Sequence, residues 1–573
     1  MCYAFLLDFK IFYNGITALS QWKWERDYLI TKNMTKTIYE QTTLQHLLNI
    51  SIQLGSEENT DILMENILIA AIDVASADAG SIYLVNQDKE LEFRTVLNKS
   101  LPIPKDKKSA EKITFPNIPL MIEGKPNNKA IAAHSANTGE VTNIADVYDE
   151  LPFDFSAARE MDKLTGYRTK SMVTFPLRDH TKDIIGVIQL INAIESGNII
   201  PFSKKTEKQL LSFATLGAVA LTNHSLIHCM EQLFESFAKT IASVIDEKSS
   251  HTGNHCHRVP ELTIMIADAV HQVDKGPLSS FHMSPEDRYQ LGIAGWLHDC
   301  GKIGIPDHIM EKSKKLQTIF DRIEYINAKL EIASRDIELA FKDSIIEAIT
   351  NDKAIDMKVL ERKQRESQQQ LSIDRAFLKK INIGSEFLSD DQTEQVHIIA
   401  KRYSISLGGI EQPLLNTDEV NNLSIKRGTL NDEERIIMKR HMNITQDILE
   451  SLPFPKHLSK VTEFALGHHE KVDGTGYPRG LTKEQMSIPA RVMAIADVFE
   501  ALSAADRPYK QAKSVSECLK IMGTLVNNQH LDGDLFTIFV REKVYENYIY
   551  KFANPEQLDD FDMEAIPGLQ SYN

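Results

Sequence analysis

The chain has 573 residues, of which 42% are hydrophobic and 25% are charged, and its formal net charge is −16. This length is too great for one ordinary hydrophobic core and predicts roughly two to four domains. The negative charge argues against broad binding to nucleic acid or to an anionic membrane surface, but it is compatible with a small anionic ligand held by a local metal or arginine cluster.

The five cysteines are scattered and form no C-x-x-C pair. This pattern favours a reducing cytoplasm over a disulfide framework. No continuous apolar run reaches the roughly 18 residues of a membrane helix, so no membrane span is predicted. The apolar N-terminal stretch contains Asp8 and Lys10 and is therefore unlike the core of a signal peptide. We interpret residues 1–39 as an N-terminal lead-in and predict a cytoplasmic protein.

Residues 40–225 alternate between helical and strand patterns. Apolar residues at spacings of three and four predict a helix within 40–75. Two strand–turn–strand patterns follow, at 79–98 and 171–193, and helical spacing returns at 204–223. Helix, antiparallel strands and helix in this order predict an α+β sensor-type domain.

The same region resembles the GAF family, because the segments GSIYLV and VTFPLRDHTKDIIGVIQLIN occur in the family's usual order. The resemblance implies a sensor domain that binds a regulatory ligand. Cyclic-nucleotide-binding members carry an Asn-Lys pair, a Phe and an Asp-Glu pair as a spaced set. Two members of that set are replaced here, so the resemblance leaves the ligand unspecified. The corresponding residues are Asn192 and Ala193, Phe202, and Thr206 and Glu207.

A heptad-like seam follows, in which apolar or small polar residues alternate at spacings of four and three, with one extra residue near Phe237. Such a seam is typical of a two-stranded coiled coil. The helix either packs onto a flanking domain or pairs with the same helix of a second protomer. We predict the homodimer and assign residues 226–246 as a linking signalling helix. The seam consists of Val219, Asn223, Leu226, Met230, Leu233, Phe237, Ile241 and Val244.

Residues 313–426 have a different character. The segment DRIEYINAKLEIASRDIELAFKDSIIEAI is strongly helical, with Ile326, Leu330 and Ile337 on one face. A polar segment and a loop-rich stretch follow it. This region is predicted to be an inserted helical subdomain without a reactive site.

Histidines and aspartates recur in apolar surroundings in the C-terminal half. A lone histidine on an apolar helix is more often a hydrogen-bonded core residue than a ligand, and Asp497 alone could pair with Arg491. Five predicted helices, however, each supply such groups, and buried titratable groups are costly unless they are paired or bound to metal. Imidazoles with a bridging carboxylate suit iron, manganese or zinc. The candidate ligands are His251, His255, His298, Asp299, His441, His468, His469 and Asp497.

The motifs HDCGKIGIPD, HHEKVDGTGYPRGL and IPARVMAIADVFEALSAADRPYK resemble those of the HD-GYP family of metal-dependent phosphohydrolases. The resemblance covers residues 247–312 and 427–550, with the insertion at 313–426 between them and a tail at 551–573. It implies an all-helical bundle with two or three metal ions, most often iron or manganese. The predicted fold is therefore multidomain: an α+β GAF sensor domain, then an all-α HD-GYP bundle with a helical insertion.

The family hydrolyses cyclic dinucleotides, chiefly cyclic di-GMP, to the linear dinucleotide pGpG and in some members to GMP. The resemblance implies that all the candidate histidines and aspartates except His251 bind metal, with Asp299 bridging two ions. It implies that Lys302 holds a non-bridging phosphate oxygen in the transition state. The remaining substrate contacts would come from Gly476, Tyr477 and Pro478, and from Arg507 and Lys510 at the second phosphate.

Two features depart from the family pattern. His251 stands where trinuclear members carry a glutamate, and an imidazole cannot bridge two ions, so two metals are predicted, with His251 as the candidate ligand of a third. The spacing from Asp497 to DRPYK is one residue longer than usual, which affects the placement of Arg507.

Three functions remain open at this stage: a cyclic di-GMP phosphodiesterase regulated by the GAF domain, a hydrolase of cyclic GMP-AMP, or a receptor without turnover. The complete ligand set and Lys302 favour a hydrolase. The insertion is predicted to shield the site, to dock a partner such as a diguanylate-cyclase domain, or to be passive.

Overall fold

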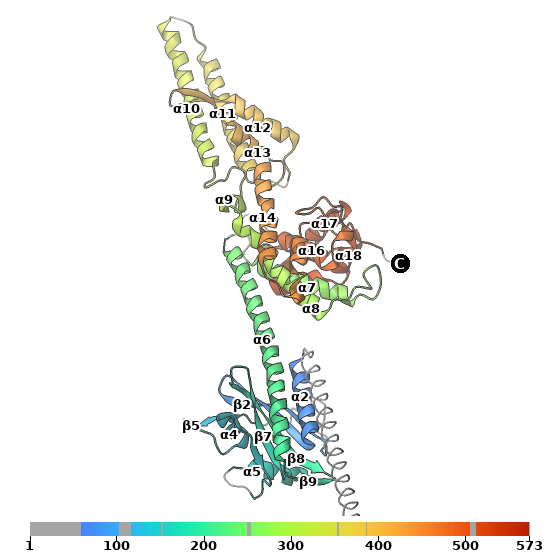
Figure 1. The fold of residues 1–573 in the computed structure, drawn as a ribbon. Coiled ribbons are helices and arrows are strands. Elements are labelled where there is room, and N and C mark those ends of the chain that lie inside the picture. Colours follow the sequence, from blue (N-terminus) through green and yellow to red (C-terminus); the bar gives the residue numbers. More distant parts are fainter. Residues whose placement is uncertain are drawn as a thin grey trace, which may run out of the picture. The chain divides into compact units, whose positions relative to one another are not determined.

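The described residues form two compact units, divided between residues 232 and 233 (Figure 1). The structure is a computed structural model. Of the residues discussed above, the lead-in, His251, Arg507 and Lys510 lie outside the part that it describes. The described ranges are 59–101, 116–149, 153–248, 254–351, 354–384, 387–504 and 512–571.

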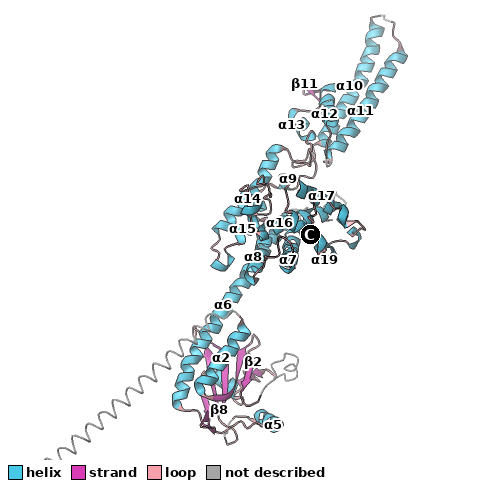
Figure 2. Ribbon diagram, turned by 90° about the vertical axis from the view of Figure 1, so that its right-hand side faces the viewer, coloured by secondary structure: helices cyan, strands magenta, loops and turns pink. Residues whose placement is uncertain are grey.

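The first unit is an α+β domain built on one seven-stranded sheet, with strand order β3-β2-β1-β8-β7-β6 and β9 beside β8. The strands are drawn in magenta in Figure 2. The two predicted strand pairs are confirmed as the antiparallel pairs β1–β2 and β7–β8. The main bounds are α2 Thr60–Ala75, β1 Ala77–Val85, β2 Glu90–Asn98, β3 Ile118–Pro119, α4 Ile131–Thr138, β6 Thr142–Ile144, α5 Ser156–Thr165, β7 Met172–Arg178, β8 Ile184–Glu195 and β9 Asn198–Ile200.

Helix α6 (Lys204–Lys248) has 45 residues and contributes to the core of each unit. Phe213 and Ala218 are buried in the core of the first unit, and Ala242 and Ile245 are buried in the core of the second. Among the helices of the described ranges, α6 alone is long and apolar enough to cross a membrane by length and composition, with a mean hydropathy of 1.4 in its most apolar window. The sequence predicted a linking helix within this segment and no membrane span.

Most of the heptad-like seam of α6 lies outside both cores, although Ile241 packs against the core of the second unit. Leu226, Met230, Leu233 and Phe237 are 49%, 67%, 71% and 50% exposed. The helix therefore packs onto its flanking domains mainly with other residues, and the seam offers a continuous apolar stripe on the surface of the single chain.

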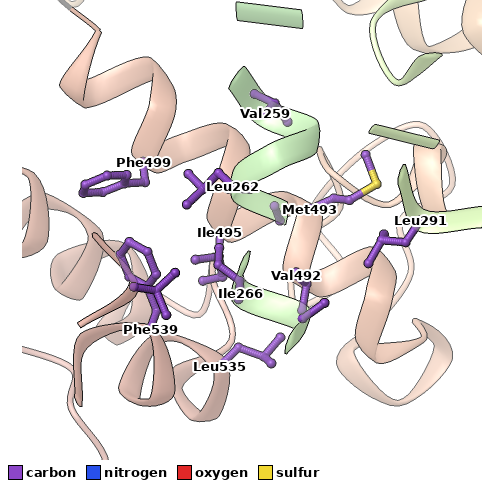
Figure 3. Packing of buried hydrophobic residues seen from close by; sticks show 14 of the residues in the cluster. Val259, Leu262, Ile266, Leu291, Val492, Met493, Ile495, Phe499, Leu535 and Phe539 are labelled. Carbon is purple, nitrogen blue, oxygen red and sulfur yellow. The ribbon is translucent and has the colours of Figure 1, made fainter. Parts of the chain in front are cut away.

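The second unit is a helical bundle, as predicted. Helices α7, α16 and α18 pack around Leu262, Ile266, Ile495 and Phe539, all of which are fully buried (Figure 3). Apolar residues at helical spacing supply this core, and polar side chains such as Ser284 and Asn431 cap the first turns of the helices that they precede. The bounds are α7 His255–Gln272, α8 Pro285–Leu297, α9 Asp307–Met310, α14 Asp432–Ser451, α15 Val461–Leu466, α16 Ile488–Ser503, α17 Val515–Asn527, α18 Gly533–Arg541 and α19 Val544–Phe552.

The insertion is helical and has its own hydrophobic core, which includes Ile326, Leu330 and Leu378. It also contains a short hairpin that was not predicted, in which Gly408 and Gly409 form the turn with positive φ angles of 60° and 82°. The bounds are α10 Ile323–Thr350, α11 Met357–Asn382, α12 Asp390–Arg402, β10 Ser404–Leu407, β11 Ile410–Pro413 and α13 Thr417–Leu423.

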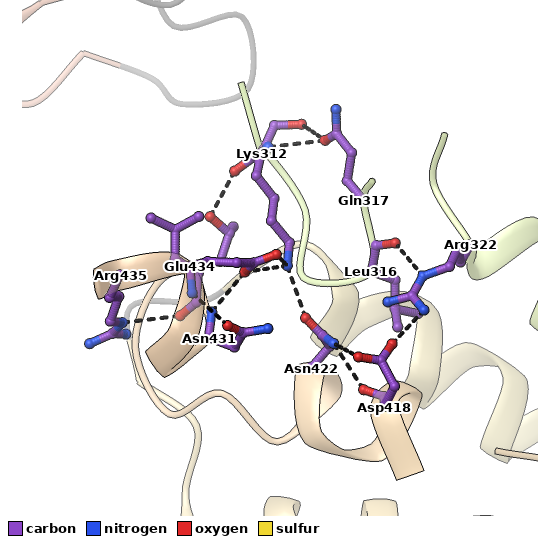
Figure 4. A network of polar contacts seen from close by, with 12 residues as sticks. Lys312, Leu316, Gln317, Arg322, Asp418, Asn422, Asn431, Glu434 and Arg435 are labelled. Atoms are coloured by element: carbon purple, nitrogen blue, oxygen red, sulfur yellow. Dashed lines mark hydrogen bonds and ion pairs between the residues drawn. The ribbon is translucent and has the colours of Figure 1, made fainter. Parts of the chain in front are cut away.

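A buried polar network joins the insertion to the first turn of α14 (Figure 4). The ammonium group of Lys312 donates to Glu434 at 2.7 Å and to Asn422 at 2.9 Å. Arg322 forms an ion pair with Asp418 at 2.5 Å. Because Lys312 is buried, its contact with Glu434 is a nearly solvent-free link between two segments 122 residues apart.

The change Lys312→Met is expected to lower the free energy of unfolding of the second unit by about 3 kcal/mol, because methionine fills the space but leaves the Glu434 carboxylate without its cation. Urea unfolding followed by circular dichroism measures this. The double change with Glu434→Gln should recover part of the loss. Lys426→Met, which removes an exposed pair with Asp390, should cost less than about 1 kcal/mol. Equal losses in Lys312→Met and Lys426→Met would contradict the prediction.

Candidate metal centre

The seven predicted ligands within the described ranges converge from five segments of the bundle. His255 begins α7, His298 and Asp299 directly follow α8, and Asp497 lies in α16. Five of the seven are buried, and His469 and Asp497 are half-buried. The remaining members are His441 in α14, and His468 and His469 directly after α15.

Asp299 lies at the centre of this cluster. Its Oδ2 is 3.2 Å from Nε2 of His298 and 3.4 Å from Nε2 of His255. Its Oδ1 is 3.5 Å from Nε2 of His441 and 3.9 Å from Nε2 of His468. Each carboxylate oxygen thus faces a different pair of imidazoles, which is the arrangement that a carboxylate bridging two cations requires.

The backbone fixes the orientation of three of these imidazoles. His298, His441 and His468 each place Nδ1 at 2.6 to 2.7 Å from the carbonyl oxygen three residues earlier. A carbonyl only accepts, so Nδ1 carries the proton and Nε2 keeps its lone pair. These three Nε2 atoms and Oδ1 of Asp299 are buried and have no hydrogen-bond partner. Unpartnered buried acceptors are costly, and divalent cations would satisfy them.

The ligand atoms form two groups, and within each group they lie within 4.8 Å of one another. The predicted alternative for Asp497 is wrong, because Arg491 forms its ion pair with Asp532 instead. Oδ1 of Asp497 is 3.4 Å from Nε2 of His255 and extends the group that contains His255. Nitrogen and carboxylate ligands fit iron, manganese or zinc. The groups are His441, His468 and His469, and His255, His298 and Asp299.

Burial controls the protonation of the first group. It lowers the pKa of His469 to about 4 and holds the pKa of His468 well below the usual value. Burial also lowers the pKa of His441. These imidazoles are therefore neutral at neutral pH, as metal ligands must be. For Asp299, burial alone would raise the pKa, but Lys302, His298 and His255 together outweigh it and hold the pKa well below the usual value.

His255 is oriented by a carboxylate that the sequence analysis missed. Its Nδ1 forms a short hydrogen bond with the buried Glu500, which also accepts from Nε of Arg258 at 2.7 Å. Burial would lower the pKa of His255, but the charge of Glu500 and the neighbouring aspartates raises it well above the usual value. Glu500 follows Asp497 by three residues on α16, so the helical spacing could have indicated that they share a face.

Lys302 lies in the turn after α8, as predicted, within the 3₁₀ helix η1 (Cys300–Gly304). Its Nζ is 2.5 Å from Oδ2 of Asp299. Burial would lower the pKa of Lys302, but Asp299 outweighs it, so the pKa is raised and the side chain is a cation at the edge of the cluster.

Tyr477 lies flat against His469, with ring centroids 4.9 Å apart and planes 29° apart. The ammonium group of Lys439 is 5.2 Å from the centroid of the tyrosine ring. Gly476 has no room for a side chain, because a Cβ there would lie 2.5 Å from Cα of Glu470. The close backbone of Glu470 therefore excludes any residue other than glycine at this position.

A second acid missed by the sequence analysis holds this loop. The buried carboxylate of Glu470 accepts the backbone N–H groups of Arg479 at 2.7 Å and of Leu481 at 3.0 Å. The loop that carries Tyr477 and Pro478 is thus fixed against the helix end that supplies His468 and His469.

A cavity of about 240 Å³ lies elsewhere on the second unit, between α6, α7 and α8, and is lined in part by Glu235, Arg288 and Trp296. None of the candidate ligands lines it, so the metal centre is recognised by its ligand geometry and not by a cavity.

Parts of the chain are similar to known proteins, and the family match contains His441, His468, His469 and Asp497 but not His255, His298 or Asp299. Residues 387–535 match a family model described as an HD domain. A segment of 116 residues is 41% identical to 3'3'-cGAMP-specific phosphodiesterase 1 of Vibrio cholerae, covering 20% of this chain and 26% of that protein. A segment of 154 residues is 32% identical to cyclic di-GMP phosphodiesterase PA4108 of Pseudomonas aeruginosa, covering 27% of this chain and 34% of that protein. The matches thus span between a quarter and about a third of these relatives.

Similar solved structures include the GAF domain from an Acinetobacter phosphoenolpyruvate-protein phosphotransferase. It has a TM-score of 0.25 and 14% identity, covering 33% of this chain and 97% of that one. Another is free methionine-R-sulfoxide reductase from Neisseria meningitidis, with a TM-score of 0.24 and 13% identity, covering 32% of this chain and 91% of that one.

Proposed function

We propose that this chain, whose C-terminal half carries an HD domain with the HD-GYP motifs, is a metal-dependent phosphodiesterase that hydrolyses cyclic di-GMP to pGpG. The cluster of buried, unpartnered ligand atoms around Asp299 carries the proposal. Relatives that are named as cyclic dinucleotide phosphodiesterases support the substrate class.

Divalent ions bound by the seven ligands, iron or manganese in this proposal, would supply an activated water and neutralise negative charge on the phosphodiester. The chain's own residues do the positioning. Asp299 holds the two ligand groups together, and Lys302 donates to a non-bridging phosphate oxygen as charge develops there. Tyr477 contacts a base or ribose in this proposal, and Gly476 and Pro478 fix the loop beside it. Arg507 and Lys510 contact the second phosphate in this proposal.

Cyclic GMP-AMP is the second candidate substrate, because a relative named as specific for 3'3'-cGAMP is 41% identical over 116 residues. A receptor without turnover is less well supported, because all seven described ligands and Lys302 lie within one cluster.

Anaerobic turnover of both cyclic dinucleotides with added Fe(II) or Mn(II) tests the proposal, together with a count of bound metal. Hydrolysis of cyclic di-GMP, with about two metals per chain, is the expected result. Preference for cyclic GMP-AMP would select the second candidate, and product analysis separates pGpG from GMP. Full metal occupancy without hydrolysis of either nucleotide would contradict the proposal and favour a receptor.

We also propose a cytoplasmic homodimer that pairs through the seam of α6 and is regulated by an unidentified ligand of the first unit. The exposed apolar seam supports this, because pairing would remove Met230 and Leu233 from water in both chains. A diguanylate-cyclase domain protein is the proposed partner of the insertion.

The change Leu233→Asp is expected to convert the dimer to a monomer, because it places a charge in the seam on both chains. Light scattering after size exclusion measures the mass. Leu339→Asp is the matched control, because Leu339 is 54% exposed but lies on the insertion. A wild-type monomer, or an unchanged mass in the seam variant, would contradict the dimer.

A further inference from the structure

The last turn of α6 contacts the turn that carries the catalytic lysine. The ammonium group of Lys248 donates to the carbonyl oxygen of Ile303 at 2.6 Å and to that of Ile305 at 2.8 Å. It also lies 3.4 Å from Oδ1 of Asp307. One side chain at the end of α6 therefore contacts two carbonyls of the segment 303–305 and the start of α9.

Those carbonyls belong to the same short piece of backbone as the proposed catalytic groups. The N–H of Lys302 donates to the carbonyl of Asp299 at 2.9 Å, and the N–H of Ile305 donates to the carbonyl of Lys302 at 3.1 Å. Because Ile303 and Ile305 lie one and three residues after Lys302, a displacement of their backbone also displaces Lys302.

The inner side of this turn is fixed by α14. The N–H of Gly301 donates to Oγ1 of Thr445 at 3.0 Å, and a Cβ on Gly301 would lie 2.0 Å from the carbonyl oxygen of His441. The outer side is more open, since Ile303 is 51% exposed. The hydrogen bonds from the ammonium group of Lys248 therefore hold the side of this turn that is least constrained by packing.

The same turn of α6 also contacts the start of α7. Oδ1 of Asp246 accepts the backbone N–H of Cys256 at 3.2 Å, next to the ligand His255. Two residues at the end of α6 thus contact both flanks of the candidate metal centre, and Lys248 contacts the flank that carries Lys302.

We propose that Lys248 is a positioning residue, which couples the end of α6 to Lys302 and Asp299 and lets a movement of that helix set the turnover rate. The inference rests on the proposed phosphodiesterase and names the regulation of its site. Binding of metal and substrate is not the property that Lys248 controls, because its ammonium group contacts backbone and Asp307 and none of the ligands.

The test uses the full chain with Mn(II) and the changes Lys248→Met and Lys248→Arg. Methionine keeps the apolar stem and removes all donors, whereas arginine keeps a cation that can bond to both carbonyls. Lys239→Met is the control, because Lys239 lies on the same helix and pairs with Glu235, 2.6 Å away.

We expect Lys248→Met to lower kcat for cyclic di-GMP by roughly 10- to 100-fold, because a small displacement of a catalytic group has an effect of that order. KM should change by less than about twofold and bound metal should not change, since ground-state contacts are kept. Lys248→Arg should retain most of the activity, and Lys239→Met should match the wild type. A kcat for Lys248→Met within about twofold of the wild type would overturn the proposal.

Hydrogen exchange measured by mass spectrometry gives a readout that does not depend on turnover. Amides of residues 299–306 should exchange faster in Lys248→Met than in the wild type, whereas those of 488–503 in α16 should not change. Unchanged exchange in 299–306 would overturn the positioning role whatever the kinetics. If the wild type hydrolyses no cyclic dinucleotide, the proposed function fails, and the exchange result still decides whether Lys248 holds the turn.

Discussion

Replacing Asp299 with asparagine is expected to lower the hydrolysis of cyclic di-GMP by at least roughly 1000-fold. Loss of an outer-shell partner of a metal ligand already costs about 10- to 100-fold, and Asp299 is the central ligand itself. Its two oxygens lie 3.2 to 3.9 Å from four imidazole nitrogens and 2.5 Å from Lys302. Asparagine has the same shape but carries no charge, and its amide nitrogen cannot serve as a second ligand atom.

Steady-state turnover and metal analysis of the purified variant measure this effect. Asp268→Asn is the matched control, because it removes an exposed carboxylate that pairs with Arg288, on the same bundle but outside the cluster. The control should keep wild-type turnover and metal. An Asp299→Asn variant that loses less than about tenfold in turnover would rule out a bridging role for this carboxylate.

The sequence indicated which histidines and aspartates lie together, because motif and periodicity agree at these positions. His298 and Asp299 end an apolar helical run, which placed them at the inner end of α8, and Lys302 follows in a turn. For Glu500 the only local signal was its spacing of three residues from Asp497 on α16, and for Glu470 no local pattern differs from that of an ordinary surface acid. Their roles arise from tertiary contacts with His255 and with the loop after His469.

Other misses have the same physical cause. The pairing of Lys312 with Glu434 joins segments 122 residues apart, and no local pattern encodes such a contact. The hairpin β10–β11 is short, and its sequence looked like loop because the two glycines dominate it. For α6, periodicity identified the seam, but only the structure separates the exposed Leu233 from the buried Ala242 on the same helix.

The protein without metal is expected to lose stability as pH falls from about 6.5 to about 4. His441, His468 and His469 have pKa values below the ordinary 6.5, because burial disfavours their charged forms, and that of His469 is about 4. Between these pH values the unfolded chain binds more protons than the folded chain, so the free energy of unfolding decreases as pH decreases. Each such imidazole contributes up to about 1.4 kcal/mol per pH unit, or about 3 kcal/mol for His469 over its window.

The shifted pKa values of His255 and Asp299 do not change how stability depends on pH in this interval. The pKa of His255 is raised, so its contribution is complete below pH 6.5 and is lost only as pH rises further. The pKa of Asp299 is lowered, so its contribution is lost only below its ordinary value of 3.8. Burial also lowers the pKa of His530, so the interval between about 4 and 6.5 reports on four imidazoles of the second unit.

Calorimetry of the EDTA-treated protein across this pH interval measures the effect as a falling unfolding midpoint of the second unit. His469→Gln should reduce the slope by roughly a quarter, because one of four titrating imidazoles is removed. His308→Gln, at an exposed position on α9, should leave the slope unchanged. Since metal binding requires neutral imidazoles, the stabilisation by added Mn(II) should also weaken as pH falls. An unfolding midpoint independent of pH over this interval would show that burial does not hold His441, His468 and His469 neutral.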